Sequence, residues 1–469
     1  MTATDAIDTM PRRRAPFVAL LGAYIISVLG TTMSELAIPW FVLTTTGSAS
    51  KTGIVAFAEL APYVATQVLA GPIVDRVGLR RSFVWGNLAA ALAVGAIPLM
   101  YAGGGLSIGV LVTLVALAGA VRGAADCANS ALVPATARVG RVPLERAAGL
   151  NAGANRTALL LGAPLGGVLI TLTSSATVVA MDAASFAVAA VMVAVFVRGI
   201  GNETIEEATA EPGATADERE TGRATDAPAA ADTLEPTAVG GGPVPAISPL
   251  RQYGRDLAEG LRFVRGDRLL LGMVTMVAVA NLIDQGMSAV MLPVWVRTEL
   301  HSATALGLLG GALGLGSLIG SLGGAWLGPH VPRRALYGFG FLLGATPRFF
   351  VLLFASSLAP VLLVFLLADT FGGSVNSVIG ATLYERIPSQ LQARVLGLVK
   401  ASAYVGLPFG ALVAGFVVES IGLRSAIAIA GLCYLVTTLA PFVFPAWRGM
   451  RRPSSAGAPA TATAAQTTA

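Results

Sequence analysis

Residues 70–83, AGPIVDRVGLRRSF, form a short charged stretch between two long apolar runs. The stretch carries Asp75, Arg76, Arg80 and Arg81 within one tight loop. A water-soluble core cannot bury two apolar runs that are joined so closely, whereas a chain that turns back at a membrane surface can. The stretch therefore indicates a polytopic membrane protein with a charged loop at one face of the bilayer.

The composition of the whole chain supports this interpretation. Of its 469 residues, 55% are hydrophobic and only 12% are charged, and the mean hydropathy is +0.73, whereas globular domains carry about 25% charged residues. The apolar runs lack the alternation of a transmembrane β-barrel, so we expect an all-α protein with about twelve transmembrane helices. The expected spans cover about residues 17–42, 52–74, 83–101, 106–134, 146–172, 176–197, 269–296, 304–328, 335–356, 358–384, 394–418 and 424–446.

Basic residues are distributed unevenly between the loops. The loops YAGGGLS (101–107), TLTSSAT (171–177) and ASSLAP (355–360) carry no charge, whereas the loops between them are rich in arginine. The positive-inside rule places the basic loops and both termini in the cytoplasm. The net charge of +5 therefore reflects topology and does not indicate a nucleic-acid partner. The basic loops contain Arg76, Arg80, Arg81, Arg138, Arg141, Arg146, Arg333, Arg334, Arg386 and Arg394.

A polar insert divides the chain into two apolar halves. Its middle is rich in Ala, Thr, Glu, Pro and Gly and lacks aromatic residues, so we expect it to be disordered. Near its end, Leu257, Leu261 and Val264 share one face among several arginines, which predicts a short amphipathic helix on the membrane surface. The expected regions are an N-terminal tail (1–16), a six-helix bundle (17–197), a cytoplasmic linker (198–268), a second six-helix bundle (269–447) and a disordered tail (448–469).

The two apolar halves repeat one another. Pro293 follows Pro39 by 254 residues, and Gly307 follows Gly53 by the same interval. The segment GAPLGG, starting at Gly162, is likewise similar to GLPFGA in the second half. Two similar bundles in the same orientation predict parallel repeats around a central site, as in alternating-access transporters.

The opening stretch also resembles a family signature. GPIVDRVGLRR matches the loop pattern Gly-x-x-x-Asp-Arg-x-Gly-x-Arg-Arg of the major facilitator superfamily. Four further segments, VRGAADCANSALVPA, LNAGANRTALLLGAPLGGVL, DAASF and ERIPSQLQARVLGL, are similar to the drug-efflux branch that includes macrolide and siderophore exporters. The resemblance implies the major facilitator fold, in which two six-helix bundles enclose a substrate cavity. The matching loop residues are Gly71, Asp75, Arg76, Gly78, Arg80 and Arg81.

In that family the loop acts as a cytoplasmic latch. The resemblance implies that Asp75 sits at the N-terminus of span 11, near Arg394, where a carboxylate stabilises the positive end of a helix dipole. Gly71 and Gly78 would allow a close approach and a tight turn. The alternative, a simple topology anchor, explains the arginines but neither the aspartate nor the glycines. The matching loop of the second half, LGPHVPRR, lacks the Asp-Arg pair, so no second latch is expected.

Several charged residues fall deep within the expected spans, where they are costly and mark candidate functional sites. The resemblance implies that spans 1, 4, 7 and 10 line the central cavity. The deep residues on those spans, which are candidates for proton coupling or substrate binding, are Glu35, Arg122, Asp126, Asp284 and Asp369. Three further deep residues lie on spans expected to be peripheral or at the interface, and for these we expect structural pairing: Glu59, Asp182 and Arg348. A static buried ion pair is the alternative for each candidate.

Arg122 and Asp126 are four residues apart on one helical face, so they can pair. Arg122 falls where the efflux branch carries an arginine in span 4, but the familiar Arg-x-x-Gln-Gly pattern is missing. Arg156 and Lys400 are equivalent positions of the repeat and could attract anions at the rim of the cavity. The alternative for these two is that their side chains snorkel to the cytoplasmic interface.

The sequence favours transport over catalysis. His301 and His330 are the only histidines, so a His-Glu-x-x-His metal site is impossible, and no Gly-x-Ser-x-Gly elbow occurs. We expect no metal and no cofactor. The predicted function is proton-coupled export of a hydrophobic or amphipathic small molecule by a monomer in a bacterial plasma membrane. An uptake symporter or a lysolipid flippase of the same superfamily is the alternative, and a membrane enzyme or a channel fits less well.

Overall fold

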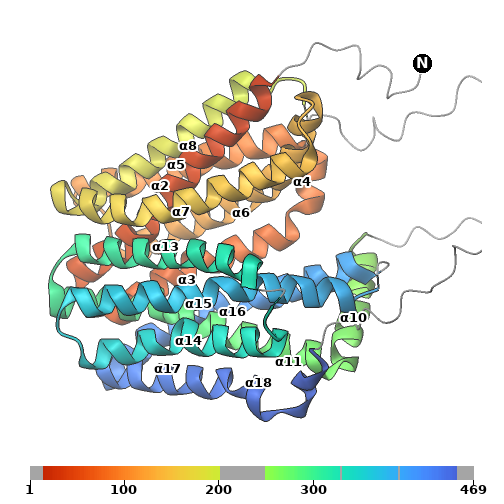
Figure 1. The fold of residues 1–469 in the computed structure, drawn as a ribbon. Coiled ribbons are helices and arrows are strands. Elements are labelled where there is room, and N and C mark those ends of the chain that lie inside the picture. The colour runs from red at the N-terminus through yellow and green to blue at the C-terminus, as the bar shows by residue number, and fades with distance from the viewer. Residues whose placement is uncertain (1–13, 201–248, 328–329, 389–390, 451–469) are drawn as a thin grey trace, which may run out of the picture.

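The computed structural model describes residues 14–200, 249–327, 330–388 and 391–450. The disorder expected for the middle of the linker and for residues 451–469 concerns residues outside these ranges. The expected start of the disordered tail at residue 448 is wrong, because residues 448 and 449 belong to the turn η4 (Pro445–Gly449) and Met450 is only 4% exposed. Within the described ranges, twelve helices are long and apolar enough to cross a membrane, which confirms the predicted all-α polytopic class. The first six form an N-terminal bundle and the last six form a C-terminal bundle. Figure 1 shows the N-terminal bundle at the top and the C-terminal bundle at the bottom.

The N-terminal bundle contains six spanning helices and one short helix in the first charged loop. These are α2 (Ala15–Thr46), α3 (Ala49–Leu69), the short α4 (Gly71–Val77), α5 (Leu79–Ala102), α6 (Ile108–Val139), α7 (Leu144–Leu172) and α8 (Ser175–Phe196). Serine caps begin three of them, because the side chains of Ser48, Ser107 and Ser174 accept hydrogen bonds from the first turns of α3, α6 and α8. Gly78 adopts a φ of 92°, so the tight turn between α4 and α5 requires glycine, as expected.

The C-terminal bundle repeats this plan after the helix α10 (Pro249–Gly266). The first span of this bundle, which is the seventh of the chain, is interrupted by two wide π-helical turns on either side of Pro293. Proline cannot donate a backbone hydrogen bond, so the regular helix is broken there. The elements are α11 (Arg268–Gly286), η1 (Met287–Met291), α12 (Leu292–Trp295), η2 (Val296–Leu300), α13 (Ala303–Leu327), α14 (Arg333–Phe354), α15 (Leu358–Arg386), α16 (Gln392–Ile421), α17 (Leu423–Thr438), α18 (Ala440–Val443) and η4 (Pro445–Gly449).

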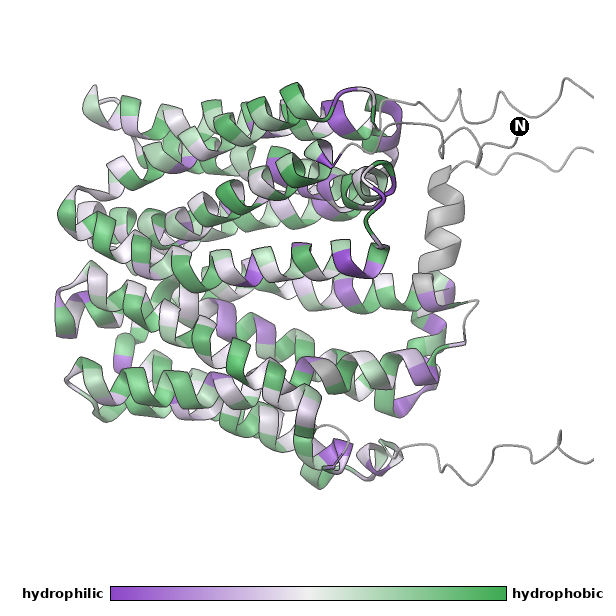
Figure 2. Cartoon of the chain, turned by 45° about the horizontal axis from the view of Figure 1, so that its top comes forward, coloured by the Kyte–Doolittle hydropathy of each residue, from purple (hydrophilic) through white to green (hydrophobic). Residues whose placement is uncertain are grey.

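The spans run roughly parallel, so the molecule has two ends. One end carries the arginine-rich loops, the short α4, the helix α10 and both described chain ends; we call it the arginine-rich end. The other carries the uncharged loops and is called the opposite end. Figure 2 shows hydrophilic residues gathered at the arginine-rich end, on the right, whereas hydrophobic residues cover most of the length of the spans. This distribution fits a bilayer that surrounds the middle of both bundles.

Helix α10 forms where an amphipathic helix is expected. Its residue Val264 is only 3% exposed and packs with Leu270, Leu383 and Val395 of the C-terminal bundle, whereas Leu261 is 37% exposed. Directly after α10, Asp267 caps α11 and forms an ion pair with Arg386 at 2.5 Å. The end of α10 is therefore fixed to the protein, and Val264 does not face lipid.

Candidate transport cavity

Three neighbouring cavities occupy the centre of the molecule. The N-bundle cavity (about 430 Å³) lies mainly among α2, α3, α5, α6, α7 and α8, with α16 of the other bundle on one side. The C-bundle cavity (about 490 Å³) lies among α11 and α13 to α17. The interface cavity (about 480 Å³) is lined by both bundles. Tyr404 lines all three, and Lys400 lines the N-bundle and C-bundle cavities. The cavities therefore meet beside α16, in the size range of small-molecule sites.

Arg122 is the centre of a charged group in the N-terminal bundle. Its guanidinium group lies 3.1 Å from Glu59 of α3, and it faces the rings of Tyr63 and Phe186, each with its centroid 5.6 Å away. The pair suggested by sequence, Arg122 with Asp126, is not the ion pair that forms. Packing of α3 against α6 brings Glu59 to the guanidinium group, although Asp126 lies on the same helix as Arg122.

The remaining acids of this region differ in their partners. Asp126 accepts a hydrogen bond of 2.9 Å from the hydroxyl of Tyr63, which itself accepts one from Gln67. Asp182 is 2% exposed and accepts a hydrogen bond of 3.3 Å from Ser185. Four carboxyl groups therefore surround one guanidinium group. We call these residues the N-bundle cluster: Glu35, Glu59, Arg122, Asp126 and Asp182.

Glu35 is the member of the N-bundle cluster that is open to the cavity. Its side chain is exposed and lines both the N-bundle and the interface cavity, together with Arg122. Within the described ranges, Glu35 has neither a hydrogen bond nor an ion pair through its side chain. The structure thus places an acid without a partner where a ligand or water can reach it.

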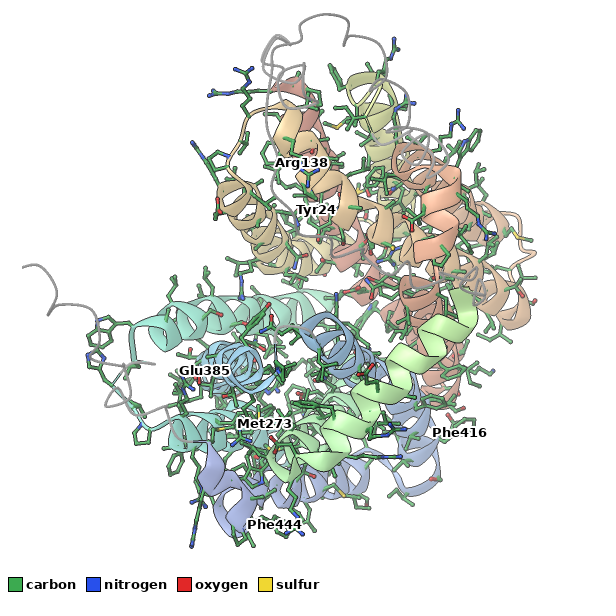
Figure 3. The ribbon with its side chains drawn as sticks, turned by 90° about the vertical axis from the view of Figure 1, so that its right-hand side faces the viewer. Tyr24, Arg138, Met273, Glu385, Phe416 and Phe444 are labelled. Atoms are coloured by element: carbon green, nitrogen blue, oxygen red, sulfur yellow. The ribbon has the colours of Figure 1, made fainter. Side chains whose placement is uncertain are left out.

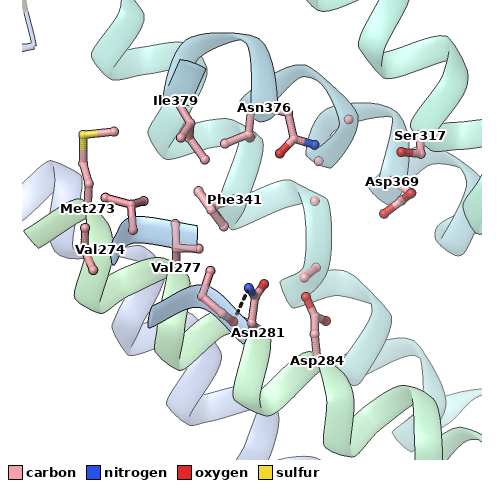
Figure 4. A pocket seen from close by; sticks show the side chains of 18 of the residues that line it. Met273, Val274, Val277, Asn281, Asp284, Ser317, Phe341, Asp369, Asn376 and Ile379 are labelled. Atoms are coloured by element: carbon pink, nitrogen blue, oxygen red, sulfur yellow. Dashed lines mark hydrogen bonds between the residues drawn. The ribbon is translucent and has the colours of Figure 1, made fainter. Parts of the chain in front are cut away.

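A second charged group lies in the C-terminal bundle. Arg348 of α14 forms an ion pair of 2.9 Å with Asp284 of α11, and Asp284 also interacts with the hydroxyl of Tyr434. Figure 4 shows Asp284 and Asp369 among the side chains that line the C-bundle cavity. The same view shows Asn281, which donates to the backbone carbonyl of Ala403 at 3.0 Å. We call Asp284, Arg348 and Asp369 the C-bundle cluster.

Sequence reasoning missed two cavity residues. Glu59 and Arg348 are expected to form structural pairs on spans that are peripheral or at the interface. Each forms an ion pair, with Arg122 and Asp284 respectively, but Glu59 also lines the interface cavity and Arg348 the C-bundle cavity. A signal was present, because each ion pair joins one of these residues to a predicted cavity residue, Arg122 or Asp284. A deep charge on a cavity-lining span needs a partner, and that partner must also lie close to the cavity.

The two rim candidates, Arg156 and Lys400, occupy different environments. Arg156 of α7 is exposed and donates a hydrogen bond of 3.0 Å to Ser321 of α13, so it joins the two bundles. Lys400 of α16 is exposed and lines two cavities, which agrees with a place at the rim. The repeat therefore fixes equivalent positions but does not fix equivalent partners.

The structure describes the loop side of the predicted latch, which is the short helix α4 (Gly71–Val77). The helix α4 packs against α3, α5 and α6, and Asp75 on it is exposed. Among the described residues Asp75 forms no hydrogen bond and no ion pair, and the side chain of Arg394 lies outside the description. A Cβ atom on Gly71 would meet nothing within 4 Å, so no close approach occurs there. Arg76 and Arg81 are exposed, whereas Arg80 donates to the carbonyl of Ala194 at 2.6 Å.

The two bundles are closed together at the opposite end. Helix α3 packs against α16 so tightly that a Cβ atom on Gly53 would lie 2.6 Å from the carbonyl oxygen of Ala411. Helix α7 packs against α13 in the same way, because a Cβ atom on Gly307 would lie 2.5 Å from the carbonyl oxygen of Ala163. The repeat-related glycines Gly53 and Gly307 thus serve equivalent contacts. Backbones meet directly where these glycines lie.

Polar groups reinforce this closure across the bundles. Glu419 of α16 accepts hydrogen bonds from the hydroxyl of Ser48 at 2.7 Å and from the backbone N–H of Ser50 at 2.8 Å, at the N-terminus of α3. Arg297 of η2 donates to the carbonyl of Leu43 in the last turn of α2. Charged side chains of one bundle thereby cap helix ends of the other.

The bundles separate toward the arginine-rich end. Beyond the hydrogen bond of Arg156, Gly149 and Gly153 of α7 meet nothing within 4 Å, and Leu322 of α13 is 67% exposed. Figure 3, which looks onto this end, shows the two bundles diverging, with Tyr24 and Arg138 on one side and Met273 and Glu385 on the other. The central cavities therefore open toward the arginine-rich end.

Comparison with known protein families identifies this arrangement. The family model of the Major Facilitator Superfamily matches residues 20–285 and, in a second match, residues 274–468. The chain belongs to the major facilitator superfamily. The resemblance expected from the charged loop is thereby confirmed, and the chain is a multi-pass membrane transporter.

Relatives within the major facilitator superfamily agree with this assignment. The protein named multidrug efflux pump Tap of Mycobacterium tuberculosis is 27% identical over 442 residues, which cover 93% of this chain and 94% of that protein. The protein of the same name from Mycolicibacterium fortuitum is 24% identical over 420 residues, covering 88% and 91% of the two chains.

Solved structures support the same fold. A transporter of the POT family in complex with a thioalcohol-conjugated peptide aligns with a TM-score of 0.67 at 10% identity, covering 95% of this chain and 100% of that one. A bacterial homologue of the human lysosomal transporter Spinster, inward-facing and unoccupied, aligns with a TM-score of 0.65 at 12% identity, covering 95% and 100%. At these identities the likeness shows the fold alone.

Proposed function

We propose that the chain exports hydrophobic or amphipathic small molecules across a bacterial plasma membrane in exchange for protons, as a monomer and by alternating access. The N-bundle cluster carries this proposal, because four carboxyl groups surround one guanidinium group and Glu35 faces the cavity without a partner. The relatives named multidrug efflux pump, matched over 93% of this chain, support the direction and the kind of substrate.

Glu35 is the proton carrier in this proposal. Glu59 shares an ion pair with Arg122, Asp126 accepts from Tyr63, and Asp284 pairs with Arg348, so these acids already have fixed partners. An ionised carboxylate without a partner is costly at membrane depth and is relieved by a proton or by a cationic ligand. Proton and substrate therefore compete for the same group, which is the requirement for exchange.

The walls of the cavities suit an amphipathic molecule. The C-bundle cavity combines the apolar side chains of Val277, Phe341 and Ile379 with the polar groups of Asn281 and Asn376. Few convergent polar groups on a mostly apolar wall are typical of small-molecule sites. A substrate with an apolar body and a polar end can therefore satisfy both kinds of surface.

The orientation follows from the charge of the loops. With the arginine-rich end in the cytoplasm, both termini are cytoplasmic and the structure is open inward. Substrate then enters the cavities from the cytoplasm or the inner leaflet. Export requires the bundles to close at the arginine-rich end and to separate at the opposite end, where Gly53 and Gly307 now hold them together.

The test is drug-induced proton movement in proteoliposomes. Purified protein is reconstituted with a pH-sensitive dye inside, a panel of amphipathic drugs is added, and the pH change is recorded with and without an uncoupler. We expect Glu35→Gln to abolish the proton movement while drug binding remains measurable. Glu145→Gln is the matched control, because Glu145 is exposed in the first turn of α7 and does not line the three central cavities.

Two results would contradict the proposal. Proton movement in Glu35→Gln equal to that of the unchanged protein would remove Glu35 as the carrier. Drug accumulation driven in the same direction as the protons would mean uptake by symport and not export. Equal behaviour of Glu145→Gln and the unchanged protein shows that loss of a carboxyl group by itself is not the cause.

A further inference from the structure

A basic pocket of about 450 Å³ lies at the arginine-rich end of the C-terminal bundle. It is separate from the three central cavities and shares no lining residue with them. Among the described residues, no acidic side chain lines it. The residues that line it are His330, Val331, Pro332, Arg333, Arg334, Arg448 and Met450.

The turn η4 gives this pocket a fixed wall. Trp447 is 3% exposed, and its ring lies 5.1 Å from that of Tyr337, so the turn is anchored in the bundle. Arg386 donates a hydrogen bond of 2.8 Å to the carbonyl of Gly449, which fixes the other side of Arg448. Because its two neighbours are held, Arg448 stands at the rim of the pocket on a rigid support.

The arginines of the pocket are compensated to different degrees. Arg333 makes two hydrogen bonds with Glu385, at 2.5 and 2.7 Å. Arg334 donates to the carbonyls of Pro441 and Phe442, at 2.7 and 3.0 Å. Arg448 forms no hydrogen bond and no ion pair with the described residues. Of the three guanidinium groups, only that of Arg333 pairs with a carboxylate, so the pocket keeps an excess of positive charge.

The surroundings place the pocket at the level of lipid headgroups. Trp326 is 73% exposed at the end of α13, and its ring lies 6.1 Å from that of His330. Phe444 and Val443 are 58% and 68% exposed on the other side, and Figure 3 shows Phe444 at the margin of this end. Exposed aromatic side chains at the ends of spans are typical of the membrane–water interface.

We propose that the basic pocket binds the phosphate group of an anionic phospholipid. Arginine pairs with phosphate through charge-assisted hydrogen bonds, and basic pockets at the ends of spans attract anionic headgroups. Topology alone requires positive charge at this end but requires no pocket and no anchored turn. Trp326 and Phe444, each four residues before a lining residue of the pocket, are exposed and offer apolar surface to the acyl chains of such a lipid. The site is independent of the transported substrate and of the coupling ion.

The experiment measures lipid retention by the full chain. Protein is reconstituted in nanodiscs of phosphatidylcholine mixed with phosphatidylglycerol, then extracted in mild detergent, and the lipids that stay bound are counted by native mass spectrometry. We expect the unchanged protein to retain phosphatidylglycerol in preference to phosphatidylcholine. In Arg448→Gln the ratio of the two retained lipids is expected to fall about fivefold. Arg448→Lys, which keeps the charge, is expected to retain most of it.

The control is Arg146→Gln, which removes an exposed arginine at the same end but on α7. Equal retention by Arg448→Gln and the unchanged protein would overturn the site, and so would an equal loss in Arg146→Gln, which would indicate general surface charge. Binding of a lipid headgroup is distinguished from binding of free phosphate by the temperature of thermal unfolding. It is measured in phosphatidylcholine discs with added inorganic phosphate or with phosphatidylglycerol in the bilayer. Stabilisation by inorganic phosphate equal to that by phosphatidylglycerol, and lost in Arg448→Gln, would also overturn the lipid proposal.

Discussion

The two ends of this transporter are built from the same helices but are held in different ways. At the opposite end, α3 meets α16 and α7 meets α13 through glycines, with backbone atoms in direct contact. At the arginine-rich end the same helices have diverged, and Gly149 of α7 has no neighbour within 4 Å of a Cβ position. Each helix pair therefore opens like a hinge, from one tightly packed end.

The closed end relies on fit more than on strong bonds. Glycine contacts allow the backbones to approach without interlocking side chains. Of the capping bonds, those of Glu419 lie at the surface, whereas that of Arg297 is partly buried. Such an interface can form and separate repeatedly at low cost. At the arginine-rich end, Asp75 on the charged loop is exposed and forms no hydrogen bond or ion pair with the described residues.

The largest effect is expected from filling a glycine contact at the closed end. In Gly307→Val the new side chain would begin 2.5 Å from the carbonyl oxygen of Ala163, so the bundles cannot close there. We expect transport to fall at least about tenfold while the protein still inserts in the membrane. Spin labels at Thr46 and Ser420, one on each bundle at this end, are expected to report a longer distance.

The control for this change is Gly109→Val at the same end of the molecule. A Cβ atom on Gly109 meets nothing closer than the hydroxyl of Ser107 at 4.0 Å, so closure is not obstructed. Normal transport by Gly307→Val, or an unchanged distance between the two spin labels, would show that the glycine contacts do not set the closed state.

The next largest effect concerns the end that is now open. If Asp75 caps α16 when the arginine-rich end closes, Asp75→Asn removes a charge that stabilises the closed form of that end. We expect transport to fall about tenfold at equal abundance in the membrane. We expect no loss of stability in the present open state, because Asp75 forms no hydrogen bond or ion pair with the described residues. Wild-type transport by Asp75→Asn, beside Glu145→Gln as a control, would reduce the loop to a topology anchor.

A smaller effect is expected from the polar caps of the closed end. Glu419→Gln keeps the size of the side chain but removes the negative charge at the N-terminus of α3. We expect the closed population at this end to fall severalfold, measured as the share of short distances between the same spin labels. Arg424→Gln is the control. Arg424 is 76% exposed at the same end, and its ion pair with Glu299 stays within the C-terminal bundle. Identical distances in both variants would mean that the glycine contacts suffice.

The membrane-spanning helices could be predicted from the sequence, because the thickness of the bilayer sets the length of the apolar run that each helix needs. The eighth expected span, 304–328, agrees with α13, and the sixth, 176–197, agrees with α8. The repeat also predicted that Gly53 and Gly307 serve equivalent purposes, since equal positions in parallel repeats face equal neighbours. The length of an apolar run, the position of a charge within it and the spacing of the repeat can all be determined from the linear sequence.

The partners of the charged residues could not be predicted in the same way. Helical spacing favoured Asp126 as the partner of Arg122, but the rotation of α3 against α6 brings Glu59 instead. The same applies to Arg348, whose depth was evident although its direction toward Asp284 was not. The π-helical turns beside Pro293 also left no distinct sequence pattern. These features depend on how helices are rotated and packed, which a single sequence does not specify.

The smallest effect is expected from shortening the connection between the bundles. Both bundles join the linker at the arginine-rich end, so a restraining linker would limit how far this end opens. The segment 205–243 is rich in Ala, Thr, Glu, Pro and Gly, and the entropy of closing a flexible loop changes slowly with its length. We therefore expect deletion of 205–243 to leave transport within about twofold of the full chain.

The measurement compares both transport and opening. Drug efflux is recorded at equal membrane abundance, and spin labels at Leu150 and Leu322, both exposed beside the opening, report how far the bundles separate. If the deletion lowers efflux and shortens this distance, the linker sets the width of the open end. If it lowers efflux at an unchanged distance, the segment holds a site for a partner. An unchanged distance with normal efflux leaves the hinge of each helix pair as the only limit, so the difference between the two ends arises within the bundles themselves.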